Sequence, residues 1–285
     1  MLALLAMAAV QMSGAIKIVA MSDIHAMSEM LVEKSGAAID KYAASDMRMI
    51  KESAEILRTV IGKIIEQRPD IVMISGHLTK DGERLSHDFV ASQLERLRAK
   101  GIKVLVIPGN HDISNANAKY FNGKERRTAA AITRKEFRDI YSHFGYGGDV
   151  KCDTASLSYA AEPVKGLVVI GIDSNRDEEN LLKARGDSVN TYHTAGRIKD
   201  ATLRWITDQA RSARAQGKRV VAMMHHHLIE HFDKEAQLLD KYVVADHENV
   251  RNELIDAGVH AFLTGHLHLS DIAREYIALN QSAFA

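Results

Sequence analysis

Residues 104–112 read Val-Leu-Val-Ile-Pro-Gly-Asn-His-Asp and join an apolar run to amide, imidazole and carboxylate side chains. The run at 104–107 is aliphatic and β-branched, which is typical of a strand that is buried on both faces of a sheet. The polar residues Asn110, His111 and Asp112 therefore follow the end of a predicted strand.

Four further segments repeat this arrangement of an apolar run that ends in histidine or carboxylate residues. The runs cover residues 16–21, 71–74, 220–224 and 261–263, and the polar segments after them are Asp23-Ile24-His25, Ser75-Gly76-His77, His225-His226-His227 and Gly265-His266-Leu267-His268. In an open α/β sheet, residues beyond the carboxyl ends of the strands converge on one crevice. We therefore expect these distant segments to meet at one site in an α/β fold.

The donor types in these segments predict a metal site. The donors are Asp23, His25, Asn110, His225, His266 and His268, with His77 as a further candidate. Imidazole, carboxylate and amide donors without a thiolate suit Zn, Mn or Fe(II) and exclude a Cys-type structural zinc site. They are too many for one tetrahedral ion, whereas two divalent ions roughly 3.5–4 Å apart are the usual arrangement for a phosphoryl transfer. Of the three consecutive histidines, His225 directly follows its strand and is favoured over His226 or His227.

The ordered set Asp-x-His, Gly-Asn-His-Asp, His and Gly-His-x-His resembles the calcineurin-like metallophosphoesterases from residue 21 to residue 268. The resemblance implies a four-layer α/β/β/α sandwich of two mixed sheets. It also implies one metal at Asp23, His25 and His268 and a second at Asn110, His225 and His266. His111 would be the general acid that protonates the leaving oxygen, with Asp112 as its orienter, and a metal-bound hydroxide would attack a phosphomonoester or phosphodiester.

One position departs from the family pattern. Where the family has Gly-Asp, whose carboxylate bridges both ions, this chain has Gly76-His77. A neutral imidazole has one lone pair and no charge, so we expect His77 to weaken the binding of at least one ion, or to bind only one. Asp81 is an alternative bridge if the loop shifts. The sequence therefore leaves two functions open: an active phosphoesterase, or a catalytically impaired relative that serves as a binding module or is a degenerate product.

The two ends of the chain carry separate expectations. Residues 1–15 include an apolar run at 2–10 that is either a signal peptide for export to the periplasm or the medium, or an apolar extension of a protein that stays in the cytoplasm. Residues 16–285 form the predicted phosphoesterase domain. Because few residues follow His268, we expect the C-terminal part of the second sheet to be missing.

Amphipathic periodicity predicts the helices that cover the sheets. The predicted helices are residues 47–67, 86–100, 133–144, 200–216 and 247–257, and antiparallel strands are allowed at 157–160 and 167–172. Long loops at 26–45, 113–133 and 175–197 are where a cap or lid would lie. Lys124-Glu125-Arg126-Arg127 predicts a solvated loop or helix start, with a phosphate-binding rim as the functional alternative.

Composition excludes several partners. The 285 residues are 46% hydrophobic, which is enough for a substantial core. Lysine plus arginine and aspartate plus glutamate number 37 each, so the net charge gives no footprint for nucleic acid. The single cysteine excludes an internal disulfide, and the apolar run at 2–10 is too short to cross a bilayer. The expected partner is a small-molecule phosphoester, and the oligomeric state stays open.

Overall fold

The first sheet is built from the apolar runs that precede the Asp-x-His, Gly-His and Asn-His segments. The computed structural model describes residues 15–183 and 194–274. Its first sheet has the order β1-β3-β4 with all strands parallel. The strands are β1 (Ile18–Met21), β3 (Ile71–Ser75) and β4 (Lys103–Ile107). Every residue of β3 is buried, as expected for the central strand of a sheet covered on both faces.

The second sheet is mixed and has the order β11-β10-β9-β8-β7. Strand β10 pairs in parallel with β9 and β11, whereas β8 pairs antiparallel with β9 and β7. The antiparallel strands allowed at 157–160 and 167–172 are thereby confirmed, although the first of them covers residues 159–164. The strands are β7 (Lys151–Cys152), β8 (Tyr159–Val164), β9 (Leu167–Ile172), β10 (Arg219–Met224) and β11 (Phe262–Leu263).

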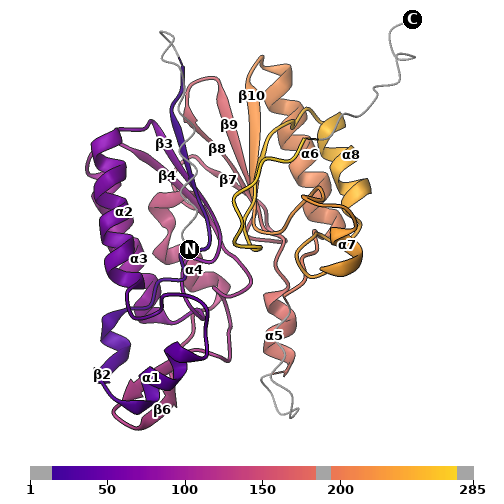
Figure 1. Ribbon diagram of the computed structural model, residues 1–285. Helices are drawn as coiled ribbons and strands as arrows, with labels where there is room; N and C mark the ends of the chain where they lie inside the picture. The colour runs from indigo at the N-terminus through magenta and orange to yellow at the C-terminus, as the bar shows by residue number, and fades with distance from the viewer. Residues whose placement is uncertain (1–14, 184–193, 275–285) are drawn as a thin grey trace, which may run out of the picture.

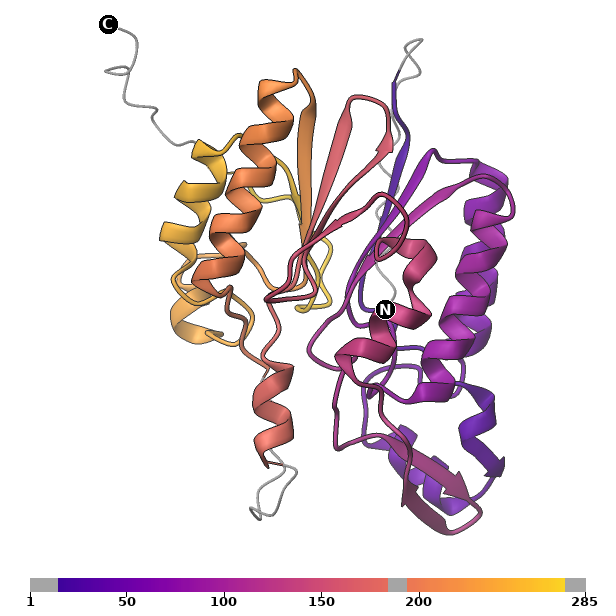
Figure 2. The same cartoon turned by 180° about the vertical axis from the view of Figure 1, so that it is seen from behind.

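The two sheets pack face to face between two helical layers (Figure 1). Residues of β3 and β4, such as Met73 and Ile107, share one buried cluster with Tyr159, Val169 and Met223 of the second sheet. The Tyr159 hydroxyl donates a 3.0 Å hydrogen bond to the carbonyl of Val106 and so joins the sheets directly. Seen from behind, the two helical layers lie on opposite outer faces (Figure 2). The predicted four-layer α/β/β/α sandwich is confirmed.

The five predicted helices lie close to the expected positions, with the largest differences at two boundaries, and residues 177–183, which were predicted to be loop, form a further helix. The helices are α2 (Ser53–Gln67), α3 (Arg84–Arg98) and α4 (Arg134–Ile140) on the first sheet, and α5 (Asp177–Lys183), α6 (Asp200–Ala215), α7 (Glu235–Leu238) and α8 (His247–Asp256) in the second half of the chain. The helix predicted from residue 47 begins only at Ser53, because residues 47–52 form turns. The helix predicted at 133–144 ends at Ile140 and is followed by a 3₁₀ turn, η2 (Ser142–Phe144).

A small third sheet joins two of the predicted loops. Its order is β2-β5-β6, with β2 and β5 parallel and β5 and β6 antiparallel. The elements are η1 (Glu29–Leu31), β2 (Val32–Lys34), α1 (Ala37–Ala44), β5 (Lys119–Asn122) and β6 (Glu125–Thr128). The prediction of a loop or helix start at residues 124–127 was wrong, because Gly123 turns the chain back at φ 61° and residues 125–128 pair with β5 as an exposed strand. Figure 1 shows this unit at the bottom of the molecule.

The expectations for the two ends fall largely outside the described residues. The apolar run at 2–10, predicted as a signal peptide or an extension, lies entirely outside them. Residues 264–274 contain no further strand, so within the described chain the second sheet reaches only to the two-residue strand β11. No helix in the described ranges is both long and apolar enough to cross a membrane.

Candidate metal centre

The residues predicted as metal ligands lie in turns just beyond the strands, and most of these turns have an unusual backbone. Among the described residues other than glycine, nine have a positive φ, and five of these are Asp23, His25, His77, His266 and His268. Such conformations cost free energy and persist where surrounding contacts impose them, often at functional sites. The turns therefore aim these five side chains into one place at the expense of local strain.

Two glycines let the turns come close enough for the side chains to meet. A Cβ on Gly76, which has φ 92°, would lie 2.5 Å from His225 Nδ1. A Cβ on Gly109 would lie 2.5 Å from the backbone nitrogen of His77. No side chain fits at either distance, so glycine at these two positions is what allows β3, β4 and β10 to deliver ligands to a shared site.

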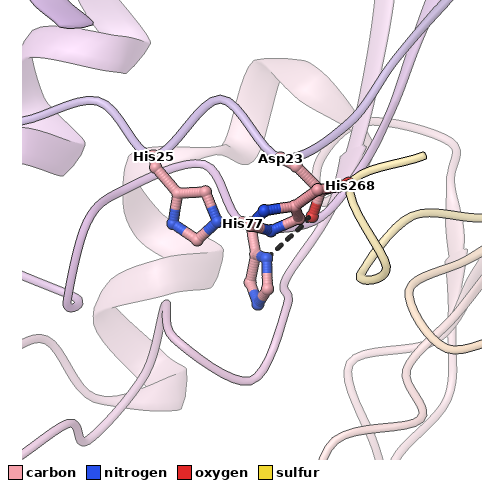
Figure 3. Close-up of side chains that lie close together, drawn as sticks. All are labelled: Asp23, His25, His77 and His268. Carbon is pink, nitrogen blue, oxygen red and sulfur yellow. Dashed lines mark hydrogen bonds and ion pairs between the residues drawn. The ribbon is translucent and has the colours of Figure 1, made fainter. Parts of the chain in front are cut away.

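The side chains form two clusters of potential metal ligands that share His77. One cluster contains Asp23, His25, His77 and His268, and the other contains His77, His225 and His266; within each cluster the ligand atoms lie within 4.8 Å of one another. Figure 3 shows the first cluster, with His77 and His268 beside Asp23 and with His25 on the other side of His77. Asn110 belongs to the second cluster, since its Oδ1 lies 2.7 Å from His77 Nε2 and 3.2 Å from His225 Nε2.

The ring of His77 lies between the Asp23 carboxylate of the first cluster and the Asn110 amide oxygen of the second. Its Nδ1 is 2.7 Å from Asp23 Oδ1, and its Nε2 is 2.7 Å from Asn110 Oδ1. Burial and the nearby histidines, His111 first among them, hold the pKa of His77 well below its ordinary value, so the ring is neutral and carries one N–H. The carboxylate of Asp23 is the stronger acceptor, so the N–H is at Nδ1 and donates a hydrogen bond to Asp23. The lone pair on Nε2 then faces the second cluster, where a cation would relieve its repulsion with the amide oxygen.

The other histidines of the site are also suited to binding a cation. Burial first, and then neighbouring histidines or Arg48, lower the pKa of His25 and His225 well below the ordinary value. Burial, followed by the proximity of His226, does the same to the pKa of His266. Neutral imidazoles are the form that binds metals. The buried Nδ1 of His266 has no hydrogen-bond partner among the described residues, which is a further sign that the donor set fits a metal ion.

His111 lies at the edge of the clusters, and the residue that orients it is Asp81. Its Nδ1 contacts Asp81 Oδ1 at 2.9 Å, and its ring centroid is 5.2 Å from that of His25. The expectation that Asp112 orients His111 was wrong. The Asp112 carboxylate instead accepts hydrogen bonds from the backbone nitrogens of Leu78, Thr79 and Gly109 and so holds the two ligand turns together.

Asp81 is therefore a partner of His111 and is not placed as the replacement bridge. It is 2% exposed and also accepts from Tyr42 and Lys80. Although burial opposes it, the hydrogen bond with His111 and the charge of Lys80 lower the pKa of Asp81. A carboxylate that stays ionised fixes the tautomer of His111, with the proton on Nδ1 and Nε2 turned to other partners.

Comparisons with known proteins identify the family of this chain. The family model for calcineurin-like phosphoesterases matches residues 16–270. The chain belongs to the calcineurin-like phosphoesterase family. Among solved structures, a dimetal phosphatase from Danio rerio matches with a TM-score of 0.56 at 15% sequence identity, over 88% of this chain and 81% of that chain. No curated protein sequence gives a significant match. The resemblance inferred from the sequence is thereby confirmed.

An arginine that the sequence did not point to lies beside the first ligand cluster of this phosphoesterase family member. Arg48 lies in the turns before α2, in a stretch predicted to be helical, and its Nη1 is 3.0 Å from His25 Nδ1. Asp46 holds the guanidinium with contacts of 2.7 Å to both Nε and Nη2. Nothing in the sequence around residue 48 distinguishes it from a solvated arginine on a helix.

His226, the alternative to His225, has a different position in this calcineurin-like fold. Its Nδ1 accepts a 2.7 Å hydrogen bond from the Ser174 hydroxyl, and its Nε2 donates to the carbonyl of Thr194 at 2.8 Å. Both ring nitrogens are therefore committed to hydrogen bonds. The structure places His225, and not His226, in the second cluster.

Proposed function

We propose that this protein is a metal-dependent phosphoesterase that hydrolyses a small phosphomonoester or phosphodiester. The observation that carries the proposal is the pair of ligand clusters sharing His77, with the His111–Asp81 pair at their edge. Family membership and the dimetal phosphatase neighbour support the same reaction class.

The chemistry divides between the ions and the side chains. Divalent ions, when bound, would polarise the phosphoryl oxygens and supply a nucleophile at neutral pH. His111 would hold a proton at Nε2 for the leaving oxygen, and Asp81 would stabilise the charged imidazole that donates it. For that step the ring must carry protons on both nitrogens. The acid at the site is therefore the imidazolium form, whose stability depends on Asp81.

The two clusters should differ in their affinity for metal. The Nδ1–H of His77 donates a hydrogen bond to Asp23, which leaves His77 Nε2, His225, His266 and Asn110 to hold one ion. Three histidines with an oxygen donor form a set typical of zinc or a similar borderline ion. Asp23, His25 and His268 would hold the second ion more weakly, because no carboxylate bridges it to the first.

A catalytically impaired relative is the second candidate, and His77 is the observation that favours it. Without a bridging carboxylate, two bound cations would have less negative charge between them, so the second ion would cost more free energy to bind. Such a chain would keep the fold and one ion and would act as a binding module.

Hydrolysis of aryl phosphomonoesters and phosphodiesters with added Mn²⁺ or Zn²⁺, for the native chain and His77→Asp side by side, tests the proposal. The proposal holds if the native chain turns over and a chelator abolishes turnover. Activity only in His77→Asp supports the impaired relative, and so does inactivity of both when circular dichroism shows that both are folded. Metal content after dialysis should rise from about one ion to two on His77→Asp substitution.

A further inference from the structure

The Arg48 guanidinium is held by the Asp46 carboxylate next to His25 of the first ligand cluster. Its Nη1 lies 3.0 Å from His25 Nδ1 and 3.4 Å from His25 Nε2. Its Nε and Nη2 each lie 2.7 Å from Asp46, and its backbone nitrogen donates to the same carboxylate at 2.9 Å. The side chain is 26% exposed, so it is not sealed off from solvent.

We propose that Arg48 binds the phosphoryl oxygens of the substrate beside the Asp23, His25 and His268 cluster. This inference rests on the proposed function and names one further residue of the same site. The planar guanidinium matches the geometry of phosphate oxygens. Because Asp46 already fixes its plane, little side-chain entropy is lost when an anion binds.

The charge of Arg48 supports a role toward an anion and not toward the metal. A guanidinium beside a site for divalent cations repels those ions and weakens their binding. The Asp46 carboxylate offsets this cost only in part, since it also lies 3.5 Å from Lys80 Nζ. A phosphate group in contact with both Arg48 and the ions would turn the repulsion into attraction.

The neighbouring lysine is not placed for the same role. Lys80 is 5% exposed, and its Nζ is 2.8 Å from Asp81 and 3.5 Å from Asp46. Its charge is therefore committed to the carboxylates of Asp81 and Asp46. The rings of His25 and His111 are 5.2 Å apart, so the residue that Arg48 contacts also borders the proton donor for the leaving oxygen.

Two titrations of Arg48→Met measure the effect. The first follows Mn²⁺ binding to the metal-free protein, and the second follows inorganic phosphate binding to the Mn²⁺-loaded protein by calorimetry. The expected result is a phosphate Kd at least tenfold higher than in the native chain, with a Mn²⁺ affinity that is unchanged or tighter. Arg48→Lys should give an intermediate phosphate Kd, because an ammonium keeps the charge without the planar fork.

Arg98→Met is the matched control, since Arg98 also pairs with a carboxylate, Glu95, but on the exposed face of α3. It should leave both affinities unchanged. An Arg48→Met protein that keeps its phosphate affinity, or that loses Mn²⁺ affinity as well, would overturn the proposal and make Arg48 a support for His25. If phosphate binding depends on Arg48 but the native chain hydrolyses no ester, the inference stands and the proposed function fails.

Discussion

At the scale of single residues, the structure separates side chains that bind from side chains that orient. Asp23 contacts Nδ1 of His77, and Asp81 contacts Nδ1 of His111. Each carboxylate therefore keeps the N–H at Nδ1 and leaves Nε2 of its histidine for another partner. Asp112 binds three backbone nitrogens and holds the turns themselves. Carboxylates of the same chemical type thus have different functions because of what surrounds them.

Loss of the proton donor should slow turnover without loss of metal. We expect His111→Gln to lower kcat by about 10²- to 10⁴-fold, which is the usual range for a general acid, with metal content unchanged. Asp81→Asn should lower kcat less, because the donating ring loses the carboxylate that orients it. Steady-state kinetics and metal analysis check both; loss of metal in His111→Gln would make it a ligand.

His87 should make the fold less stable in mildly acidic solution. Its ring is fully buried, with Nδ1 2.8 Å from the Tyr141 hydroxyl and Nε2 2.8 Å from the carbonyl of Asp112. Burial lowers the pKa of His87 below 6.5, so the unfolded chain binds a proton that the folded chain refuses. This contribution to stability is complete above pH 6.5 and is lost as the pH falls below it.

Urea unfolding at pH 7.5 and 5.5 measures this effect. Between these two pH values the native chain should lose up to about 1.4 kcal/mol more stability than His87→Gln, whose side chain does not titrate in this range. Equal losses in the two proteins would mean that His87 is protonated in the folded state.

At the scale of elements, the site depends on how closely the turns after the strands approach one another. The turn after β4 passes so near the turn after β3 that Gly109 has no room for a Cβ. In contrast, the glycine inside α2, Gly62, has no heavy atom within 4 Å of where a Cβ would be. The same substitution at the two positions therefore separates crowding at the site from ordinary backbone effects.

Gly109→Ala should damage the site, whereas Gly62→Ala should stabilise the protein. A Cβ at residue 109 would meet the His77 backbone at 2.5 Å, and the overpacking should cost on the order of 1–3 kcal/mol and weaken metal binding. Alanine in the middle of a helix is better than glycine by about 1 kcal/mol. Thermal unfolding and metal titration check the pair; normal metal affinity in Gly109→Ala would show that the turns can separate freely.

At the scale of the whole molecule, the candidate metal centre lies where potential ligands from both sheets meet. Residues after β1 and β3 belong to the first sheet, whereas those after β10 and β11 belong to the second. The packed interface that contains Tyr159 and Met223 fixes the sheets against each other and so sets the spacing of the ligands. An ion bound across them should therefore stabilise the entire fold.

Metal should raise the unfolding temperature, and a chelator should reverse the increase. At 100 times its Kd, an ion that binds only the folded state adds about 2.7 kcal/mol, which should appear as a shift of several degrees. His266→Ala removes one ligand of the second cluster and should reduce the increment, whereas His143→Ala, at an exposed histidine paired with Glu95, should keep it. An equal increment in His266→Ala would place the stabilising ion elsewhere.

The sequence by itself determined where along the chain the ligand-bearing strands lie, and it also determined the fold class and the family. Runs of β-branched residues encode buried strands locally, and the polar residues after them are adjacent in the chain, so both can be read without the fold. The predicted ligands could be named for the same reason: Asp23, His25, His77, Asn110, His225, His266 and His268 each follow such a run within a few residues.

Only the tertiary structure decided which partner each of these residues has. Asp81 and His111 are 30 positions apart, His25 and Arg48 are 23 apart, and the loops that form the third sheet pair over a still longer separation. No local pattern marks such contacts, because they depend on how the sheets pack and on glycines that let turns approach. Neighbours along the chain set the elements, but neighbours in space set protonation, orientation and charge at the site.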